Sequence, residues 1–154
     1  MDREPRQKLE REYYHLIDII QKYDEYFINI KTWSISIGAL VTGAGISLQS
    51  IYVPFLVILL GISFWLTEAS FKVVQLSHFK RIAELENFLG QKGEMSAEFP
   101  SPRIIKAYSE CRKENEESKL LRRVIWWNHV MFPHLVFVVT GLVGSLVLIV
   151  QSII

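Results

Sequence analysis

The hydrophobic and polar positions of this chain form two long uncharged blocks, separated by stretches with a heptad pattern. Residues 32–67 and 124–154 contain no Asp, Glu, Lys or Arg. Soluble core helices of this length would carry a polar face, so lipid is the solvent that these blocks match. The pattern predicts an all-α fold, an integral membrane protein with three transmembrane helices and cytoplasmic helical extensions, arranged as an oligomeric bundle.

The first uncharged block is too long to cross a bilayer only once. As one helix it would extend about 54 Å, against a hydrocarbon core of about 30 Å. Gln49, Ser50 and the following Pro54 favour a turn between two helices. We therefore expect a transmembrane hairpin over residues 32–72, with spans at about 32–49 and 54–71. The second block predicts a third span over residues 130–154, which Pro133 starts or kinks.

Apolar residues outside the blocks step by four and three, which is the spacing of a coiled-coil seam. The first seam predicts a cytoplasmic amphipathic helix over residues 1–31 that continues into the first span. Its members are Leu9, Tyr13, Leu16, Ile20, Tyr23, Phe27 and Ile30. A second, more polar seam continues the second span, with Phe71, Gln75, His78, Ile82, Leu85 and Leu89. Packing within the chain and packing between subunits are both compatible with this spacing.

Residues 73–129 are expected to form a cytoplasmic helical extension that contains a loop at 90–102. Gly90 is a suitable terminator, and the Gly, Ser and Pro residues that follow are typical of a loop. Ser101 before Pro102 is a favourable helix start. One mostly polar helix is expected from there to about residue 128.

The orientation follows from the positive charges, because basic residues in short flanks stay on the cytoplasmic side. All 17 Lys and Arg residues precede the first expected span or lie between the second and third. Trp33, Trp65, Trp126 and Trp127 lie near the same expected boundary, where indole rings prefer to sit. The prediction is a multi-pass protein of the cell inner (plasma) membrane, with its N-terminus cytoplasmic and its C-terminus outside.

Charge and cysteine content narrow the function classes. The net charge is +1, and no run of like charge suggests a nucleic-acid partner. Cys111 is the single cysteine, so neither a disulfide nor a paired-cysteine metal site is indicated. The sequence contains no phosphate-binding loop, nucleophile elbow or HExxH motif. We expect no cofactor, no metal and no enzymatic activity.

Small residues line one face of two expected spans. They are Ser34, Gly38, Thr42 and Gly45 in the first span, and Thr140 with Gly144 and Gly141 with Ser145 in the third. Such a stripe lets membrane helices approach closely. Alternatively, it lines a narrow water-filled path in an oligomer. The spacing is compatible with both.

Glu68 is the one acidic residue close to the apolar part of a span, and it must face protein or water. Three roles are open: an interfacial pair with Lys72, a ring of carboxylates at the inner mouth of a cation pathway, or a proton relay. His129 and His134 are five residues apart, so they do not converge on a metal, and both are expected at the membrane interface. His15 and His78 are expected to be structural.

Several basic residues are expected just inside the membrane surface. They are Lys72, Lys80, Arg81, Lys119, Arg122 and Arg123. They could contact anionic headgroups of the membrane lipid, although the topology alone requires positive charge there.

The stretch FWLTEASFKVVQLSHFKRIAELENFL, residues 64–89, follows a tight membrane hairpin. It resembles small bacterial membrane proteins, including multi-helix effectors of anti-phage defence systems such as the SLATT-type group. With the hairpin included, the resemblance extends from about residue 32 to residue 89. It implies a self-associating antiviral effector that breaches the inner membrane when triggered. The trigger would come from a separate cytoplasmic sensor or partner protein.

These features favour a homo-oligomer whose cytoplasmic helices assemble subunits and whose spans form, or open into, an ion-conducting or membrane-disrupting pathway. One alternative is a noncatalytic accessory or scaffold subunit of a larger membrane complex. A second alternative, an enzyme that acts on lipid, would need Glu68, His129 or His134 to converge with other polar groups at the interface.

Overall fold

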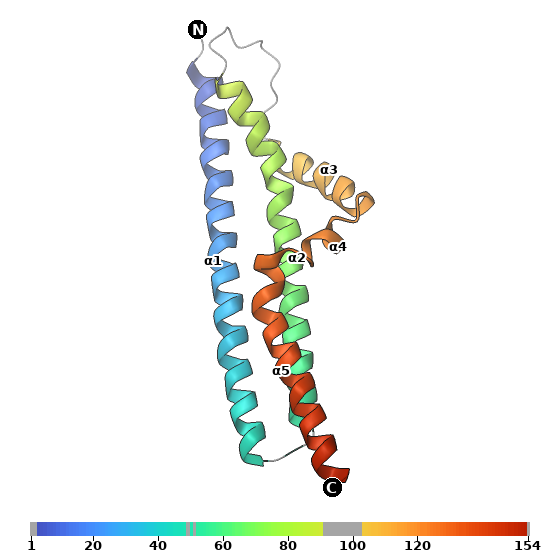
Figure 1. Ribbon diagram of the computed structural model, residues 1–154. Helices are drawn as coiled ribbons and strands as arrows, with labels where there is room; N and C mark the ends of the chain where they lie inside the picture. Colours follow the sequence, from blue (N-terminus) through green and yellow to red (C-terminus); the bar gives the residue numbers. More distant parts are fainter. Residues whose placement is uncertain (1–2, 49, 51, 91–102, 154) are drawn as a thin grey trace. The chain divides into compact units, whose positions relative to one another are not determined.

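The computed structural model describes residues 3–48, 50, 52–90 and 103–153 (Figure 1). Helices make up 95% of these residues, and no strand occurs among them. The described residues divide into two compact units. We call Met1–Glu25 with Phe71–Leu121 the polar unit, and Tyr26–Ser70 with Arg122–Ile154 the apolar unit. The two long helices contribute residues to both.

The helix α1 covers Arg3–Leu48 without a break, so the expected amphipathic helix and the expected first span form one element. The helix α2 covers Tyr52–Gly90, and Val53 N donates to Ser50 O at 3.2 Å in the turn before it. Pro54 lies in the opening turn of α2, where a missing N–H costs no helical hydrogen bond. Gly90, the first residue of the expected loop at 90–102, ends α2. Gln49 and the rest of that loop, with Ser101 and Pro102, lie outside the described residues.

The expected single helix from residue 103 to about 128 is divided in two. Ile104–Glu117 forms α3, and Leu120–Val124 forms the short α4. Between them Lys119 has a φ of 52°, and the N–H groups of Ser118 and Lys119 donate to carbonyls of the last turn of α3. A left-handed residue at this position ends a helix, and it is normally glycine. No glycine marks the break here, so the residue pattern does not predict it.

Asn128–Ile153 forms α5, which begins earlier than the expected span and contains Pro133 within its second turn. Trp126 N and Trp127 N donate to Arg123 O and Val124 O at 3.1 and 3.0 Å. These bonds close the end of α4 just before α5 starts. The first turns of α5 therefore follow a structured corner rather than a continuous helix.

In the polar unit, α1 and α2 bring the two seams together within one chain. Leu9 and Leu16 form a buried cluster with Ile82 and Leu85, and each of these side chains is 5% exposed or less. Partly buried neighbours pack against it: Tyr13, Ile17, Ile19, Ile20, Phe88, Leu89 and Ile104. Each fully buried Leu or Ile contributes about 1.5–3 kcal/mol of transfer free energy. Of the two packing alternatives, the structure shows the intrachain one.

In the apolar unit, α1, α2 and α5 approach closely at glycines. A Cβ atom at Gly38 would overlap the ring of Phe137, and one at Gly141 would lie 2.7 Å from Pro54 O. A Cβ at Gly61 would lie 3.1 Å from His134 O. Small residues permit this approach where lipid gives no hydrophobic force between helices.

Two of the described helices are long and apolar enough to cross a membrane, α2 and α5. The expected first span at 32–49 is not among them. The apolar half of α1 carries Ser34, Ser36 and Thr42, which lower its mean hydropathy, and Gln49 at its expected end is not described.

Candidate functional site

Four polar side chains meet in the apolar unit, and we call them the polar cluster: Lys31 and Ser34 of α1, Glu68 of α2 and His134 of α5. Ser34 Oγ lies 2.9 Å from His134 Nδ1, and His134 Nε2 lies 2.9 Å from Glu68 Oε2. The other carboxylate oxygen, Oε1, lies 3.2 Å from Lys31 Nζ. Ser34, Glu68 and His134 are 2%, 1% and 0% exposed. The cluster therefore links three helices, and all of its members except Lys31 are buried.

The helices present these groups for simple geometric reasons. Lys31 and Ser34 are three residues apart, so they share a face of α1. Phe64 lies one turn before Glu68 on α2, and its ring stacks on His134 at a centroid distance of 6.4 Å and an interplanar angle of 12°. The lack of a side chain at Gly61 lets the His134 backbone approach α2. The imidazole is thus fixed by an aromatic face and by a partner on each ring nitrogen.

The charges of the cluster require compensation because Glu68 is buried. An isolated carboxylate in an apolar interior is very costly, and it persists only when paired and hydrogen-bonded. Lys31 supplies a cation whose side chain is 31% exposed, and His134 supplies a second hydrogen-bond partner. Among the described residues, no buried side-chain nitrogen or oxygen lacks a partner. The cluster can hold charge and a proton inside an apolar bundle.

The residue types of the cluster match those of a serine hydrolase, but Ser34 is not exposed as the nucleophile of such an enzyme would be. A nucleophile must reach its substrate, and Ser34 is 2% exposed. This arrangement therefore offers no accessible hydroxyl, and it does not favour the lipid-acting enzyme considered from the sequence.

The residue pattern distinguishes Glu68 but does not connect it with Lys31 or His134. Lys72, the partner considered from the sequence, donates from Nζ to Gln75 Oε1 at 2.6 Å in the polar unit. His134 was expected at the membrane interface, and the structure buries its side chain completely within the apolar unit. A usable signal was present, because His134 is a titratable residue within an uncharged block and Lys31 is the last cation before one. The spacing of His129 and His134 along α5 contains no information about a partner on another helix.

The residues of the small-residue stripes lie where helices of the apolar unit approach one another. Gly45 faces Val53 of α2, with a distance of 2.5 Å from a Cβ placed there to Val53 Cγ1. Hydroxyls of the stripes donate to the carbonyl four residues earlier: Thr42 to Gly38, Thr140 to Val136 and Ser145 to Gly141. Ser145 is 8% exposed. In a single chain these positions serve close packing, which is one of the two roles expected for them.

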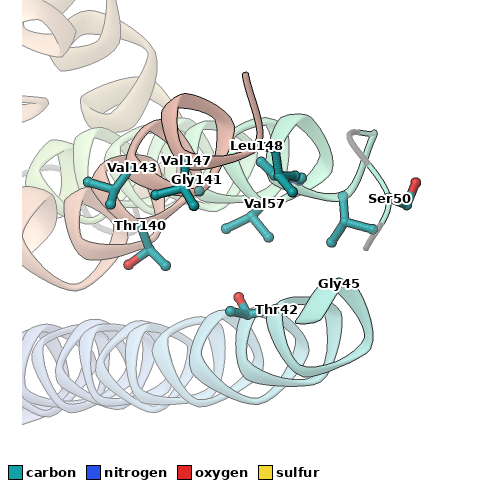
Figure 2. A pocket seen from close by; sticks show the side chains of 12 residues that line it. Thr42, Gly45, Ser50, Val57, Thr140, Gly141, Val143, Val147 and Leu148 are labelled. Carbon is teal, nitrogen blue, oxygen red and sulfur yellow. The ribbon is translucent and has the colours of Figure 1, made fainter. Parts of the chain in front are cut away.

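A cavity of about 340 Å³ opens beside the same stripes (Figure 2). Thr42 and Gly45 line it from α1, and Val57 and Gly141 line it from α2 and α5. Other lining residues are Ser50, Val53, Pro54, Thr140, Val143, Gly144, Val147 and Leu148. The hydroxyls of Thr42 and Thr140 already donate within their own helices, so this surface offers an ion few ligands.

The polar unit contains a buried ion pair next to its apolar cluster. Arg81 Nε donates to Glu12 Oε1 at 2.9 Å, and Arg81 Nη1 donates to Glu84 Oε2 at 3.1 Å. Burial alone would lower the pKa of the Arg81 guanidinium, but Glu12 and Glu84 outweigh it, so the pKa is raised. Gln75 Nε2 adds a bond to Asp24 Oδ1 at 2.8 Å. These bonds fix the register of the α1 and α2 seams.

Two further residues of the polar unit have structural roles. His78 Nδ1 lies 3.0 Å from Val74 O, and its ring lies 5.2 Å from that of Tyr108. Cys111 is buried, and both burial and Glu114 raise the pKa of its thiol. A thiol with a raised pKa is a poor nucleophile. Among the described residues, no group of three His, Cys, Asp or Glu side chains is arranged to hold a metal ion.

Comparison with known proteins gives no relative. No protein-family model matches the chain. No curated protein and no solved structure matches it either. The resemblance of residues 64–89 to SLATT-type effectors therefore stays a hypothesis.

Proposed function

We propose that this chain is an integral membrane protein with three spans, formed by the second half of α1, the first half of α2 and α5. The support is the exposure of the apolar side chains. The most apolar windows of α2 and α5 are only 22% and 17% buried, whereas the core helix of a soluble protein is mostly buried. Leu59 is 60% exposed and Leu146 is 64% exposed. Such a surface matches lipid or another apolar partner.

The support for α1 as the remaining span is its place beside the two candidates. Its Ser34 faces His134 of α5, while Leu40 on another side is 73% exposed. A helix that turns small and polar residues inward and large apolar residues outward is typical of a membrane bundle. We further propose a cytoplasmic N-terminus and an external C-terminus at the inner (plasma) membrane, because all Lys and Arg residues lie on one side of the proposed spans.

Cysteine labelling tests this topology. In a C111S background, Y52C places a thiol at the start of α2, where Tyr52 is 75% exposed, and E117C places one at the exposed end of α3. A membrane-impermeant maleimide should label Y52C from the outside only and E117C from the inside only. Labelling of both positions from the same side would contradict three spans.

We propose that copies of the chain assemble and form, or open into, an ion-conducting or membrane-disrupting pathway, in response to a separate sensor or partner protein. The single observation that carries this proposal is the polar cluster. Ionisable side chains within membrane bundles are costly, and they typically mark ion pathways or proton relays. In one chain, Lys31, Glu68 and His134 satisfy one another, so conduction requires these helices to rearrange in an oligomer.

Ion flux in reconstituted liposomes tests this activity. Purified chain should release an entrapped ion-sensitive dye or collapse a K⁺ gradient, and E68Q should change the rate at least several-fold. E117Q, an exposed carboxylate of the polar unit, is the matched control and should leave the rate unchanged. Liposomes that stay tight at every protein density, with native-membrane extract added, would contradict the pathway.

A specific observation favours a second function, that of a noncatalytic scaffold subunit. Gly38, Gly45 and Gly141 each pack against residues of the same chain, and Glu68 is paired with Lys31 of the same chain. A chain whose pore candidates are satisfied internally needs no lumen of its own. Recovery from native membranes in fixed ratio with other membrane proteins, together with tight liposomes, would favour the scaffold over the pathway.

A further inference from the structure

The imidazole of His134 has a partner from a different helix on each ring nitrogen. Nε2 lies 2.9 Å from Glu68 Oε2, and Nδ1 lies 2.9 Å from Ser34 Oγ. The Glu68 carboxylate beside Lys31 has no hydrogen to donate, so Nε2 must carry one. In the neutral ring Nδ1 is then an acceptor, and the Ser34 hydroxyl donates to it. With one ammonium and one carboxylate, the polar cluster in this state has no net charge.

The Ser34 hydroxyl has a second direction in which it can donate. Other hydroxyls of the apolar unit donate to the carbonyl four residues earlier, as Thr42 does to Gly38 at 2.7 Å and Ser63 does to Leu59 at 2.8 Å. A serine inside a helix has such a carbonyl within reach, and for Ser34 it belongs to Ile30. Its oxygen would remain free to accept a hydrogen bond from His134. Ser34 can therefore act as donor or as acceptor toward the ring without a large movement.

We propose that the polar cluster is a proton-binding site, in which His134 Nδ1 takes up one proton from water and the Ser34 hydroxyl reverses to accept it. The proton binds the lone pair of Nδ1, and the hydroxyl hydrogen turns to Ile30 O. No covalent bond breaks, each side chain keeps its hydrogen bonds, and the net charge of the cluster changes from zero to plus one. The ring then donates to oxygen on both sides, to Glu68 and to Ser34.

The charged groups near the ring come from two other helices. The charged groups that face it are Glu68 from α2 and, on the other oxygen of that carboxylate, Lys31 from α1. Phe64 of α2 covers one face of the ring. Helix α5 itself contributes no Asp, Glu, Lys or Arg, because residues 124–154 contain none. The Glu68 carboxylate is thus the nearest charged group to the ring.

The binding site exists whether or not the chain conducts ions. Its use as a trigger rests on the proposed pathway: protonation changes the charge of a site that joins three helices, and protonation of histidine biases conformations in pH-sensing proteins.

Nitrogen NMR of the full chain labelled with ¹⁵N-histidine, in lipid nanodiscs, tests the site. The variant H134Q assigns the signals of His134 against those of His15, His78 and His129. At pH 8 we expect the Nε2–H tautomer, and on acidification to pH 4 we expect both ring nitrogens to become protonated. A Nδ1–H tautomer at pH 8, or a ring that does not change over this range, would overturn the proposal.

The variant S34A tests the role of the hydroxyl, with S36A as the matched control two residues along α1. Loss of the acceptor should reduce the ratio of charged to neutral His134 about tenfold at a given pH, since hydrogen bonds to charged groups are strong. S36A, at an exposed position, should titrate like the original chain. Equal titration of S34A and S36A would overturn the role of Ser34, and the tautomer of the original chain remains decisive if S34A does not fold.

Flux measurements separate the trigger from the site. Liposomes should leak faster at pH 5 than at pH 8, and H134Q should remove this difference. An ion flux that does not change with pH, although His134 becomes protonated, would refute the role of this site as a trigger. A ring that titrates in liposomes that never leak would contradict the proposed pathway and leave the site standing.

Discussion

Removal of Lys31 is the perturbation that most directly tests how the apolar unit tolerates a buried carboxylate. At 3.2 Å two unit charges attract by about 5 kcal/mol at an effective dielectric constant of 20. The Lys31 side chain is 31% exposed, so solvent screening reduces this value considerably. We expect K31M to lower the free energy of unfolding by about 2–3 kcal/mol, at or below the lower end of the range of about 3–5 kcal/mol for a broken buried pair.

The variant E68Q should cost less than K31M, although it removes the other half of the same pair. The amide still accepts a hydrogen bond from His134 Nε2, and the exposed part of Lys31 lets the ammonium turn to water. We expect a cost of about 1 kcal/mol. In the double variant no buried charge is left uncompensated, so its cost should be about 2 kcal/mol lower than the sum of the two single costs.

Reversible unfolding in mixed micelles, followed by circular dichroism as denaturing detergent is added, measures these free energies. K113M and E117Q remove exposed charges from the polar unit and are the matched controls; each should stay within about 0.5 kcal/mol of the original chain. Additive costs in the K31M and E68Q cycle, or a K31M variant as stable as K113M, would refute the reasoning.

Three further predictions follow from particular contacts. G38A should destabilise the chain by about 1–3 kcal/mol because the new methyl group overlaps the ring of Phe137. G43A, whose added Cβ has nothing within 4 Å, should be neutral or stabilising by up to about 1 kcal/mol. The same unfolding titration compares the two variants, and equal effects would contradict the close approach of α1 and α5 at Gly38. R81M should lower the free energy of unfolding by about 3–5 kcal/mol because it leaves the Glu12 carboxylate buried without the Arg81 guanidinium, and the double variant R81M with E12L should recover most of this loss. Thermal unfolding in detergent measures both changes. A double variant as unstable as R81M would mean that Arg81 stabilises the fold through packing instead. Cys111 should react with iodoacetamide at least about tenfold more slowly than an unfolded control at pH 8, and the rate should rise above pH 9, because burial and Glu114 raise the pKa of its thiol. The folded state binds the thiol proton more tightly, so this group stabilises the fold below the ordinary thiol pKa, and the stabilisation is lost as the pH rises through the folded pKa. Equal labelling rates of the folded and unfolded chain at pH 8, measured by mass spectrometry, would contradict the raised pKa.

The sequence predicted the elements because their signals are local. Periodic apolar residues and the Gln49 to Pro54 turn gave an all-helical chain with a hairpin, and α1 and α2 agree with it apart from their exact ends. The seams led to Leu9, Leu16, Ile82 and Leu85, which the structure buries together. The division at Lys119 was not predictable, since a non-glycine residue adopts the left-handed conformation there.

The positions without charge, and hence the segments compatible with lipid, follow from the residue pattern alone, because the composition of a helix does not depend on its neighbours. The packing of the helices, in contrast, brings together Lys31, Ser34, Glu68 and His134, and it places Gly38 against Phe137. These residues lie on different helices, and their distances depend on how the helices rotate and approach one another. Spacing along one helix does not contain that information.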